Sequence, residues 1–256
     1  MPYHDFWSLH TAPFGASDLG RRYYAAKPQR EAFARIQYLV DNGHSVGLLI
    51  GDSGCGKSEL LKQVATSRGF GDHAIDVALT SCGQRTTAET LEHLAVQLGI
   101  GSDVTGWRSI RERILAAARQ HVRTVWLIDD ASVDVAAAAA SLVSQERWLT
   151  VVAAVQPERV LKVATALDVC PLRVDLTAFT LRDTMSFVRQ RLSEAGGRED
   201  IFTDGALIRM HELSDGRIAV IVRIAELAMA AAAANQQAEV NTGWIDAVQD
   251  EFVRAA

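Results

Sequence analysis

The residue types best suited to chemistry are gathered in one short stretch, Gly51 to Ser58, which reads G-x-x-x-x-G-K-S. Its glycines give the backbone the freedom to turn its amides inward around phosphate oxygens. The ammonium of Lys57 would reach the β- and γ-phosphates of a nucleotide, and the hydroxyl of Ser58 would be a ligand of Mg²⁺. The nucleotide-binding residues expected here are Gly51, Asp52, Ser53, Gly54, Cys55, Gly56, Lys57, Ser58 and Glu59.

The segments on either side of this loop are those that a phosphate site requires. Residues 45–50 (SVGLLI) are apolar and β-rich, which predicts a buried strand before the loop. Leucines and a valine follow Lys57 at helical spacing until Gly69, which predicts a helix after it. The helix N-terminus then adds its partial positive charge at the phosphates. The alternative is a glycine turn with an exposed lysine, and the flanking elements favour the phosphate loop over it.

A second group of chemical residues ends the segment TVWLIDDAS, where an apolar strand at 124–130 delivers two carboxylates, Asp129 and Asp130. Asp129 is expected to hold Mg²⁺, as the acid at the end of such a strand does in phosphate-loop enzymes. The other interpretation is a solvated turn of two acids. It is disfavoured because the phosphate loop independently requires a metal-binding partner.

The elements that must position these residues alternate along the chain. Helices separate five predicted strands, which lie at 45–50, 73–79, 124–130, 149–155 and 172–176. This alternation predicts a parallel α/β sheet whose ligand lies beyond the carboxyl ends of the strands. From Thr180 onward only helices are expected. The predicted domains are an N-terminal arm and helix counted with the core at 1–44, a nucleotide-binding core at 45–177 and a helical lid at 178–256.

The N-terminal arm is rich in aromatic residues, among them Phe6, Trp7, Phe14 and Tyr24. Two interpretations stay open. The rings could pack around an adenine base, or the arm could simply cap the core.

Composition narrows the class of protein. The chain has 256 residues, 48% hydrophobic, with a net charge of -5, so nucleic acid gains no bulk attraction. Its three cysteines form no C-x-x-C pair, and neither disulfides nor a zinc site are expected. Cys55 could have a lowered pKa inside a phosphate loop, although a small loop residue is the favoured interpretation. The longest apolar stretch, 227–234, is far shorter than the ~20 residues of a spanning helix, so a cytoplasmic protein is expected.

At this point the chain resembles the AAA+ ATPases related to general secretion pathway protein A. The resemblance rests on REAFARIQYLV, the phosphate loop, LIDDA in place of a D-E-A ending, AAVQPERV in place of G-Q-P-E-L, FVRQRLSEAGG and ALIRMHELSDGRIAVI. It implies a P-loop NTPase core of the AAA+ type, with five parallel strands flanked by helices and a small all-helical lid. It also implies ATP with Mg²⁺ as the ligand and a homo-oligomer with the nucleotide at the subunit interface.

The resemblance further assigns catalytic roles to Lys57, Asp130 and Gln156. Asp130 stands where many relatives have a glutamate that activates the attacking water. Its side chain is one methylene shorter, so slow hydrolysis is expected, because displacements near 1 Å cost on the order of 10²-fold in rate. Gln156 matches a polar sensor of the γ-phosphate or the water. Its alternative role is to start a turn before Pro157.

The arginines of the family are harder to place. Ile218-Ala219 stands where relatives have a proline-arginine pair in the lid, so Arg217 or Arg223 would have to substitute. The candidates for an arginine or lysine acting on a neighbouring subunit are Arg159, Lys162 and Arg173.

Three functions follow from these residues. The first is a Mg²⁺-dependent ATPase whose lid and oligomer respond to nucleotide and which binds a protein partner of unknown identity. The second is a nucleotide-dependent scaffold with slow or no hydrolysis. The third, less favoured, is a DNA-associated ATPase of the transposition type, for which the basic residues would be Arg182, Arg189, Arg191 and Arg198.

Overall fold

The structure is a computed structural model that describes residues 3–15, 23–67, 70, 74–101 and 106–254. The chain divides into two compact units. One contains Gln29–Asp52 and Lys57–Leu176 and is called the core unit below. The other contains Met1–Pro28, Ser53–Gly56 and Thr177–Ala256 and is called the helical unit.

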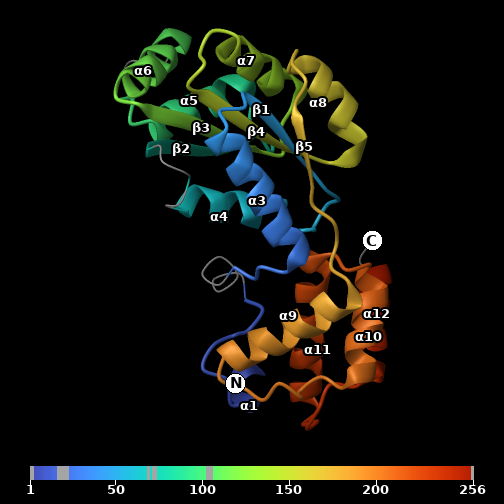
Figure 1. Cartoon of the computed structure of the whole chain (residues 1–256). Helices are drawn as coiled ribbons and strands as arrows, with labels where there is room; N and C mark the ends of the chain where they lie inside the picture. The colour runs from blue at the N-terminus through green and yellow to red at the C-terminus, as the bar shows by residue number, and fades with distance from the viewer. Residues whose placement is uncertain (1–2, 16–22, 68–69, 71–73, 102–105, 255–256) are drawn as a thin grey trace. The chain divides into compact units, whose positions relative to one another are not determined.

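A five-stranded sheet lies at the centre of the core unit (Figure 1), with the strand order β2-β3-β4-β1-β5. Every neighbouring pair of strands is parallel. The strands are β1 (Val46–Ile50), β2 (Ala74–Ser81), β3 (Val122–Asp129), β4 (Leu149–Val155) and β5 (Leu172–Asp175). The expected fold class, a parallel five-stranded sheet with flanking helices and a helical C-terminal part, is confirmed.

Helices cover both faces of this sheet. They are α3 (Lys27–Asp41), α4 (Lys57–Thr66), α5 (Thr87–Gln97), α6 (Trp107–Arg119), α7 (Val133–Val143) and α8 (Val160–Ala166), with a 3₁₀ turn, η2, at Pro157–Arg159. In Figure 1, α3 and α4 lie on the opposite side of the sheet from α6 and α7. Local chemistry fixes their starts. At α5, for example, Thr86 and Glu89 form a capping box that satisfies amides at the helix N-terminus.

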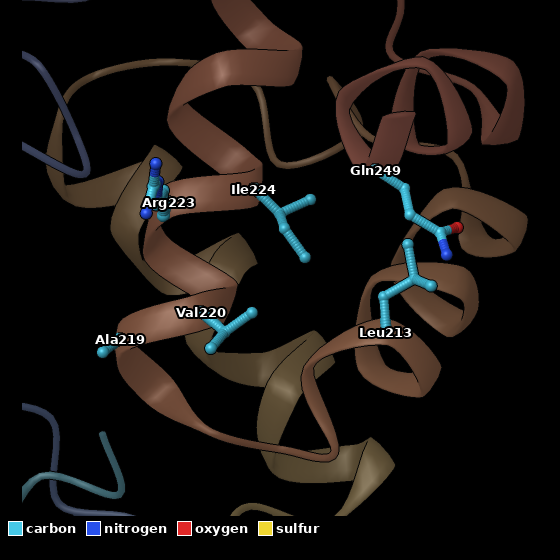
Figure 2. A pocket seen from close by; sticks show the side chains of 6 residues that line it. All are labelled: Leu213, Ala219, Val220, Arg223, Ile224 and Gln249. Carbon is cyan, nitrogen blue, oxygen red and sulfur yellow. The ribbon is translucent and has the colours of Figure 1, made fainter. Parts of the chain in front are cut away.

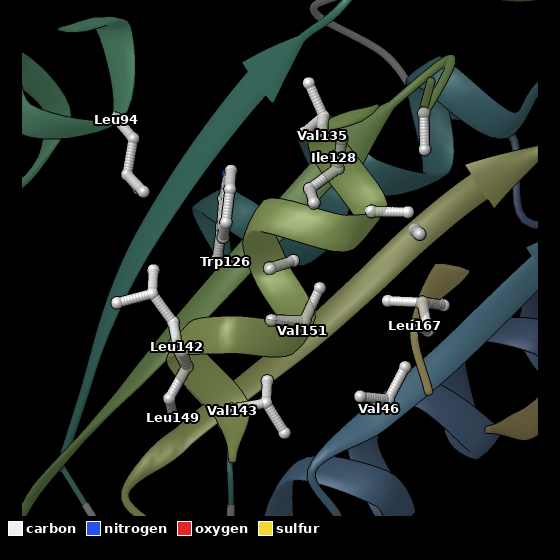
Figure 3. Close-up of a cluster of buried hydrophobic side chains, with 14 of the residues drawn as sticks. Val46, Leu94, Trp126, Ile128, Val135, Leu142, Val143, Leu149, Val151 and Leu167 are labelled. Atoms are coloured by element: carbon white, nitrogen blue, oxygen red, sulfur yellow. The ribbon is translucent and has the colours of Figure 1, made fainter. Parts of the chain in front are cut away.

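The strands are apolar because both faces of the sheet are buried. On the face covered by α5 to α8, Trp126 and Ile128 of β3 and Val151 of β4 pack with Val135 and Leu142 of α7 (Figure 3). The fully buried Trp126 also donates from Nε1 to Thr80 Oγ1 at 2.9 Å, so its one polar group has a partner. This packing holds the strands in fixed register, and their carboxyl ends therefore carry side chains at defined positions.

The helical unit consists mainly of α1 (Tyr3–Phe6), α9 (Leu181–Glu194), α10 (Asp204–Ser214), α11 (Ile218–Ala234) and α12 (Thr242–Arg254). None of the helices that the structure describes is long and apolar enough to cross a membrane.

The N-terminal arm differs from the expected assignment to the core, because residues up to Pro28 group with the C-terminal helices. The physical reason is aromatic packing. Phe14 is 1% exposed and lies 6.4 Å from the ring of Phe187 and 6.5 Å from that of Phe202. Trp7 is also buried and donates from Nε1 to the Met229 carbonyl at 3.1 Å. Of the two interpretations of the arm, these contacts favour a capping role, directed at the helical unit.

Candidate nucleotide-binding site

The glycine-rich loop connects the end of β1 to the start of α4. Gly51 continues from the strand and donates its amide to Val155 of β4 at 3.3 Å. Gly54 and Gly56 have φ of +79° and +100°, a backbone region that side chains with a Cβ rarely adopt. The glycines are therefore required by the shape of the loop as well as by the space a phosphate would need.

Lys57 is the first residue of α4, and its side chain folds back toward the start of the loop. Its Nζ donates to the Gly51 carbonyl at 2.7 Å and to the Asp52 carbonyl at 2.9 Å. An ammonium has three N–H donors, and two of them are used here. One donor remains for a phosphate oxygen.

The neighbours of Lys57 differ in how far they are available to a ligand. Ser58 is exposed in the first turn of α4. Glu59, also predicted to bind nucleotide, pairs with Lys62 on its own helix at 2.7 Å. Cys55 is 1% exposed, so its thiol is shielded from solvent, as the interpretation of a small loop residue expects.

The acidic pair lies at the carboxyl end of β3. Asp129 is the last residue of the strand, opposite Ser81 of β2, and its carbonyl accepts the Cys82 amide at 2.9 Å. Asp130 leaves the strand with φ +49°, a left-handed conformation that aspartate tolerates better than most residues. Its amide donates to Asp129 Oδ1 at 3.1 Å. The two carboxylates thus belong to one tight turn, in which the Asp130 side chain is 45% exposed.

Strand order brings the loop, the acids and Gln156 to one edge of the sheet. Strand β4 lies between β1 and β3, with Ile50 paired to Val155. Gln156 follows β4 directly, and its side chain does not cap the 3₁₀ turn that begins there. The predicted site residues of the core unit therefore end neighbouring strands, as expected for a parallel sheet that binds a ligand at its carboxyl edge.

Arg159 adds a contact at this edge that sequence analysis did not assign. It ends the turn η2, and its Nη1 donates to Asp130 Oδ1 at 2.7 Å while Nη2 donates to the Ala131 carbonyl at 2.7 Å. Arg159 is one of the residues predicted to act on a neighbouring subunit, but here it pairs within its own chain. The pairing of Arg159 with Asp130 could have been predicted only from the strand order, because β3 and β4 are neighbours and the turns that follow them lie side by side.

The remaining basic candidates lie elsewhere. Arg173 is paired with Leu48 in the sheet register, before the end of β5, and its Nε donates to Asp175 at 2.8 Å. Lys162 is exposed on α8. Their possible roles on a neighbouring subunit stay predictions.

The two lid candidates belong to the helical unit. Arg217 is the N-cap residue of α11 and donates from Nε to the Ser214 carbonyl at 3.0 Å. Arg223 lines a pocket of about 440 Å³ together with Leu213, Ala219, Val220, Ile224 and Gln249 (Figure 2). Arg217 lies beside the phosphate loop, since a Cβ built on Gly54 would be 3.9 Å from the Arg217 Cβ and the Ala219 amide donates to the Gly54 carbonyl at 3.0 Å. The roles of both arginines stay predictions.

The arginines considered for DNA are mostly engaged. Arg189 pairs with Asp204 at 2.6 Å, Arg198 with Asp200 at 3.3 Å, and Arg191 is 5% exposed beside Glu194. Paired and buried guanidinium groups contribute little to the attraction of a phosphate backbone. These contacts do not favour a DNA surface on α9.

The oxygen donors at the sheet edge suit Mg²⁺. Within the described residues there is no group of three or more His, Cys, Asp or Glu side chains that could hold a metal. Mg²⁺ does not need such a cage, because it is commonly held by one or two protein oxygens plus phosphates and water. A hydroxyl at Ser58 and a carboxylate at Asp129 match that donor set.

Cys82 lies beside the acidic turn and is 1% exposed. Burial raises the pKa of its thiol above the usual 9.0, although hydrogen bonds with Ser132 and Thr90 act in the opposite direction. The thiol is therefore neutral near pH 7 and has a packing role at the edge of the site.

The parallel sheet and the residues at its carboxyl edge have the form of a P-loop core, and residues 40–152 match the family model described as an AAA domain. The chain is 26% identical over 264 residues to general secretion pathway protein A of Aeromonas hydrophila, which confirms the expected resemblance. That alignment covers 95% of this chain and 47% of the relative, so the chain spans about half the length of the curated relative it matches.

Solved structures share the fold at low sequence identity. The ORC2 protein of Aeropyrum pernix in its ADP form has a TM-score of 0.66 at 12% identity, covering 91% of this chain and 70% of that chain. A Walker-type ATPase of Pyrococcus abyssi has a TM-score of 0.65 at 13% identity, covering 95% and 76%. Drosophila ORC bound to DNA has a TM-score of 0.64 at 16% identity, covering 95% and 66%.

Proposed function

We propose that this protein binds ATP with Mg²⁺ and hydrolyses the bond between the β- and γ-phosphates. The observation that carries the proposal is the sheet edge itself, where the phosphate loop follows β1, the acidic pair follows β3 and Gln156 follows the strand between them. The similarity to an AAA domain over residues 40–152 supports it.

Each residue has a role that its chemistry allows. Loop amides and the remaining donor of Lys57 would bind the β- and γ-phosphates. Ser58 and Asp129 would hold Mg²⁺, which would offset phosphate charge and orient the triphosphate. Asp130 would accept a proton from the attacking water, and Gln156 would contact the γ-phosphate or that water. The other loop residues from Gly51 to Glu59 would surround the phosphates with their backbone.

The proposal extends to the whole chain. Residues 45–177 would form the nucleotide-binding core and 178–256 a lid that responds to the nucleotide. A homo-oligomer with the nucleotide at the subunit interface would allow Arg173 or Arg217 to act on the γ-phosphate. Light scattering with and without Mg-ATP tests this arrangement.

The first experiment compares Lys57→Ala with the wild type by calorimetric titration of Mg-ATP and by phosphate release. Charge-assisted hydrogen bonds are worth roughly 1.5–3 kcal/mol, so affinity should fall about 10- to 100-fold. Arg108→Ala is the matched control, because it removes a cation whose side chain is 91% exposed on α6. Wild-type affinity in Lys57→Ala would contradict the proposed site.

A second candidate function is a nucleotide-dependent scaffold with slow hydrolysis. It is favoured by one observation, namely that the carboxylate of Asp130 is one methylene shorter than that of a glutamate at this position. Asp130→Glu should raise the rate of phosphate release if the missing methylene limits hydrolysis. A gain, starting from a wild type that binds Mg-ATP tightly and hydrolyses it slowly, would support the scaffold, and no gain would count against this account.

A further inference from the structure

We propose that Arg159 is a positioning residue for the hydrolytic step, because it fixes the direction of the Asp130 carboxylate. This inference rests on the proposed ATPase function. It concerns a contact that lies wholly within the core unit.

Two hydrogen bonds place the guanidinium. Nη1 reaches Asp130 Oδ1 and Nη2 reaches the Ala131 carbonyl, both at 2.7 Å. The planar fork of arginine suits two acceptors held side by side, and both acceptors belong to consecutive residues of the same turn. The contact therefore defines an orientation of the carboxylate as well as a proximity.

The acceptors are themselves held in place. Ala131 is fully buried, and its amide donates to the Ala154 carbonyl of β4 at 2.9 Å. Ser132, the next residue, caps α7 by accepting the Val135 amide at 3.2 Å. The backbone of Asp130 is therefore held between the end of β3 and the start of α7. Its side chain could still rotate, and the hydrogen bond from Arg159 restricts that rotation.

The other end of the contact comes from the turn after β4. The Arg159 amide donates to the Gln156 carbonyl at 3.0 Å, within the 3₁₀ turn η2. Arg159 therefore ties the turn that carries Asp130 to the turn that carries Gln156. The proposed proton acceptor and the proposed sensor would keep a constant separation.

The exposure of the pair argues against a role in stability. The Arg159 and Asp130 side chains are 36% and 45% exposed. Ion pairs with this much solvent contact contribute little to folding stability, because water screens them. An orienting role draws on the same small energy, so its effect on the rate of hydrolysis should be modest.

Only Oδ1 of Asp130 is taken by Arg159, and among the described residues no hydrogen bond to Oδ2 is found. In the hydrolytic step, Oδ2 would accept a proton from water while the water oxygen forms a bond to the γ-phosphorus. The bond from that phosphorus to the bridging oxygen breaks, and ADP leaves with the electron pair. Asp130 then returns the proton to phosphate or solvent.

The test is steady-state phosphate release with Mg-ATP for Arg159→Ala, Arg159→Lys, Asp130→Asn and the double variant Arg159→Ala/Asp130→Asn. Arg159→Ala should lower kcat about 2- to 5-fold, because an ion pair this exposed holds the carboxylate only weakly. Its KM should stay within about twofold, because no ligand contact is lost. Arg159→Lys should recover part of the rate, since a single ammonium keeps the charge without the fork.

The double variant separates positioning from a general structural effect. If Arg159 acts through Asp130, adding Arg159→Ala to Asp130→Asn should slow hydrolysis no further. A further loss equal to that of Arg159→Ala alone would overturn the inference, and so would an unchanged or raised kcat in Arg159→Ala. Arg108→Ala is the control for removing a surface arginine, and thermal unfolding should show all variants folded.

Failure of the proposed function is distinguishable from failure of this inference. Absence of phosphate release by the wild type, with Mg-ATP bound, would refute hydrolysis itself and the inference with it. If the wild type hydrolyses ATP and the effects of Arg159→Ala and Asp130→Asn on kcat are additive, only the positioning role is refuted.

Discussion

Replacing Gly54 by alanine tests whether the backbone shape of the loop binds the phosphates. Gly54 has φ +79°, and an L-residue in this region costs roughly 1–2 kcal/mol. A Cβ built there also lies 3.1 Å from the Ala219 Cβ, so the substitution adds a tight contact with α11. Without ligand, the substituted loop can relax to a less strained backbone. It must return to the strained shape to bind Mg-ATP, so the strain energy lowers the affinity. That amount corresponds to about 5- to 30-fold weaker binding of Mg-ATP. Calorimetric titration measures it directly.

The matched control is Gly99→Ala. Gly99 has φ +72°, and a Cβ built there meets nothing within 4 Å, so the backbone strain is similar and no contact is added. It follows α5, where its amide donates to Val96 at 3.0 Å, outside the phosphate loop. Gly99→Ala should lower folding stability by roughly 1 kcal/mol and leave affinity unchanged. Unchanged affinity in Gly54→Ala, or an equal loss in both variants, would refute the reasoning.

Two further predictions concern the packing of each unit. Thr80→Val should destabilise the core unit by about 1–3 kcal/mol, because it leaves the buried Trp126 N–H unpaired. In a Trp126→Phe background the same change should cost much less, because no N–H is left there. Denaturant unfolding of the wild type, the two single variants and the double variant measures both costs, and equal costs would contradict this reasoning. Burial, with a smaller contribution from Glu226, raises the pKa of Tyr3 to about 12 from 10.0, so its contribution to stability is complete below pH 10 and is lost as the pH rises toward 12. Thermal melts from pH 8 to 12 should therefore fall more steeply for the wild type than for Tyr3→Phe, and parallel curves would exclude this role for the phenol.

Much of the sheet could be predicted because its strands are short, continuous apolar runs. The strand expected at 149–155 is found as Leu149–Val155, and that expected at 45–50 as Val46–Ile50. Strand β2 extends beyond the predicted 79 to Ser81, because pairing with β3 up to Asp129 continues past the apolar run. The 7-residue helix α8 was not expected, since so short a segment shows little periodicity.

The arm was harder to assign because its partners are distant in sequence. An aromatic residue such as Phe14 is apolar whether it packs on the sheet or on C-terminal helices. Only the contacts with Phe187 and Phe202 decide between the two. Its apolar character predicts that the side chain is buried, but only the tertiary structure determines which helices or strands it packs against.

The site shows the same division between local and distant information. Lys57, Ser58 and Asp129 could be predicted because the loop and the strand end have recognisable local patterns. The pairing of Asp130 with Arg159 spans 29 residues and depends on β3 and β4 being neighbours. No spacing rule along one sequence contains that information, because the strand order must be known first.

These two parts of the site should respond separately to mutation. The loop residues would bind phosphates through a backbone shape that exists before the reaction, so their variants should change affinity. The turn after β3 holds Asp130 in a left-handed conformation with a paired carboxylate, and in the proposed mechanism it would contact the reacting water rather than the bulk of the nucleotide. Its variants should change kcat at nearly constant KM. A protein that needs long-lived ATP binding can therefore slow hydrolysis at this turn without weakening its nucleotide site.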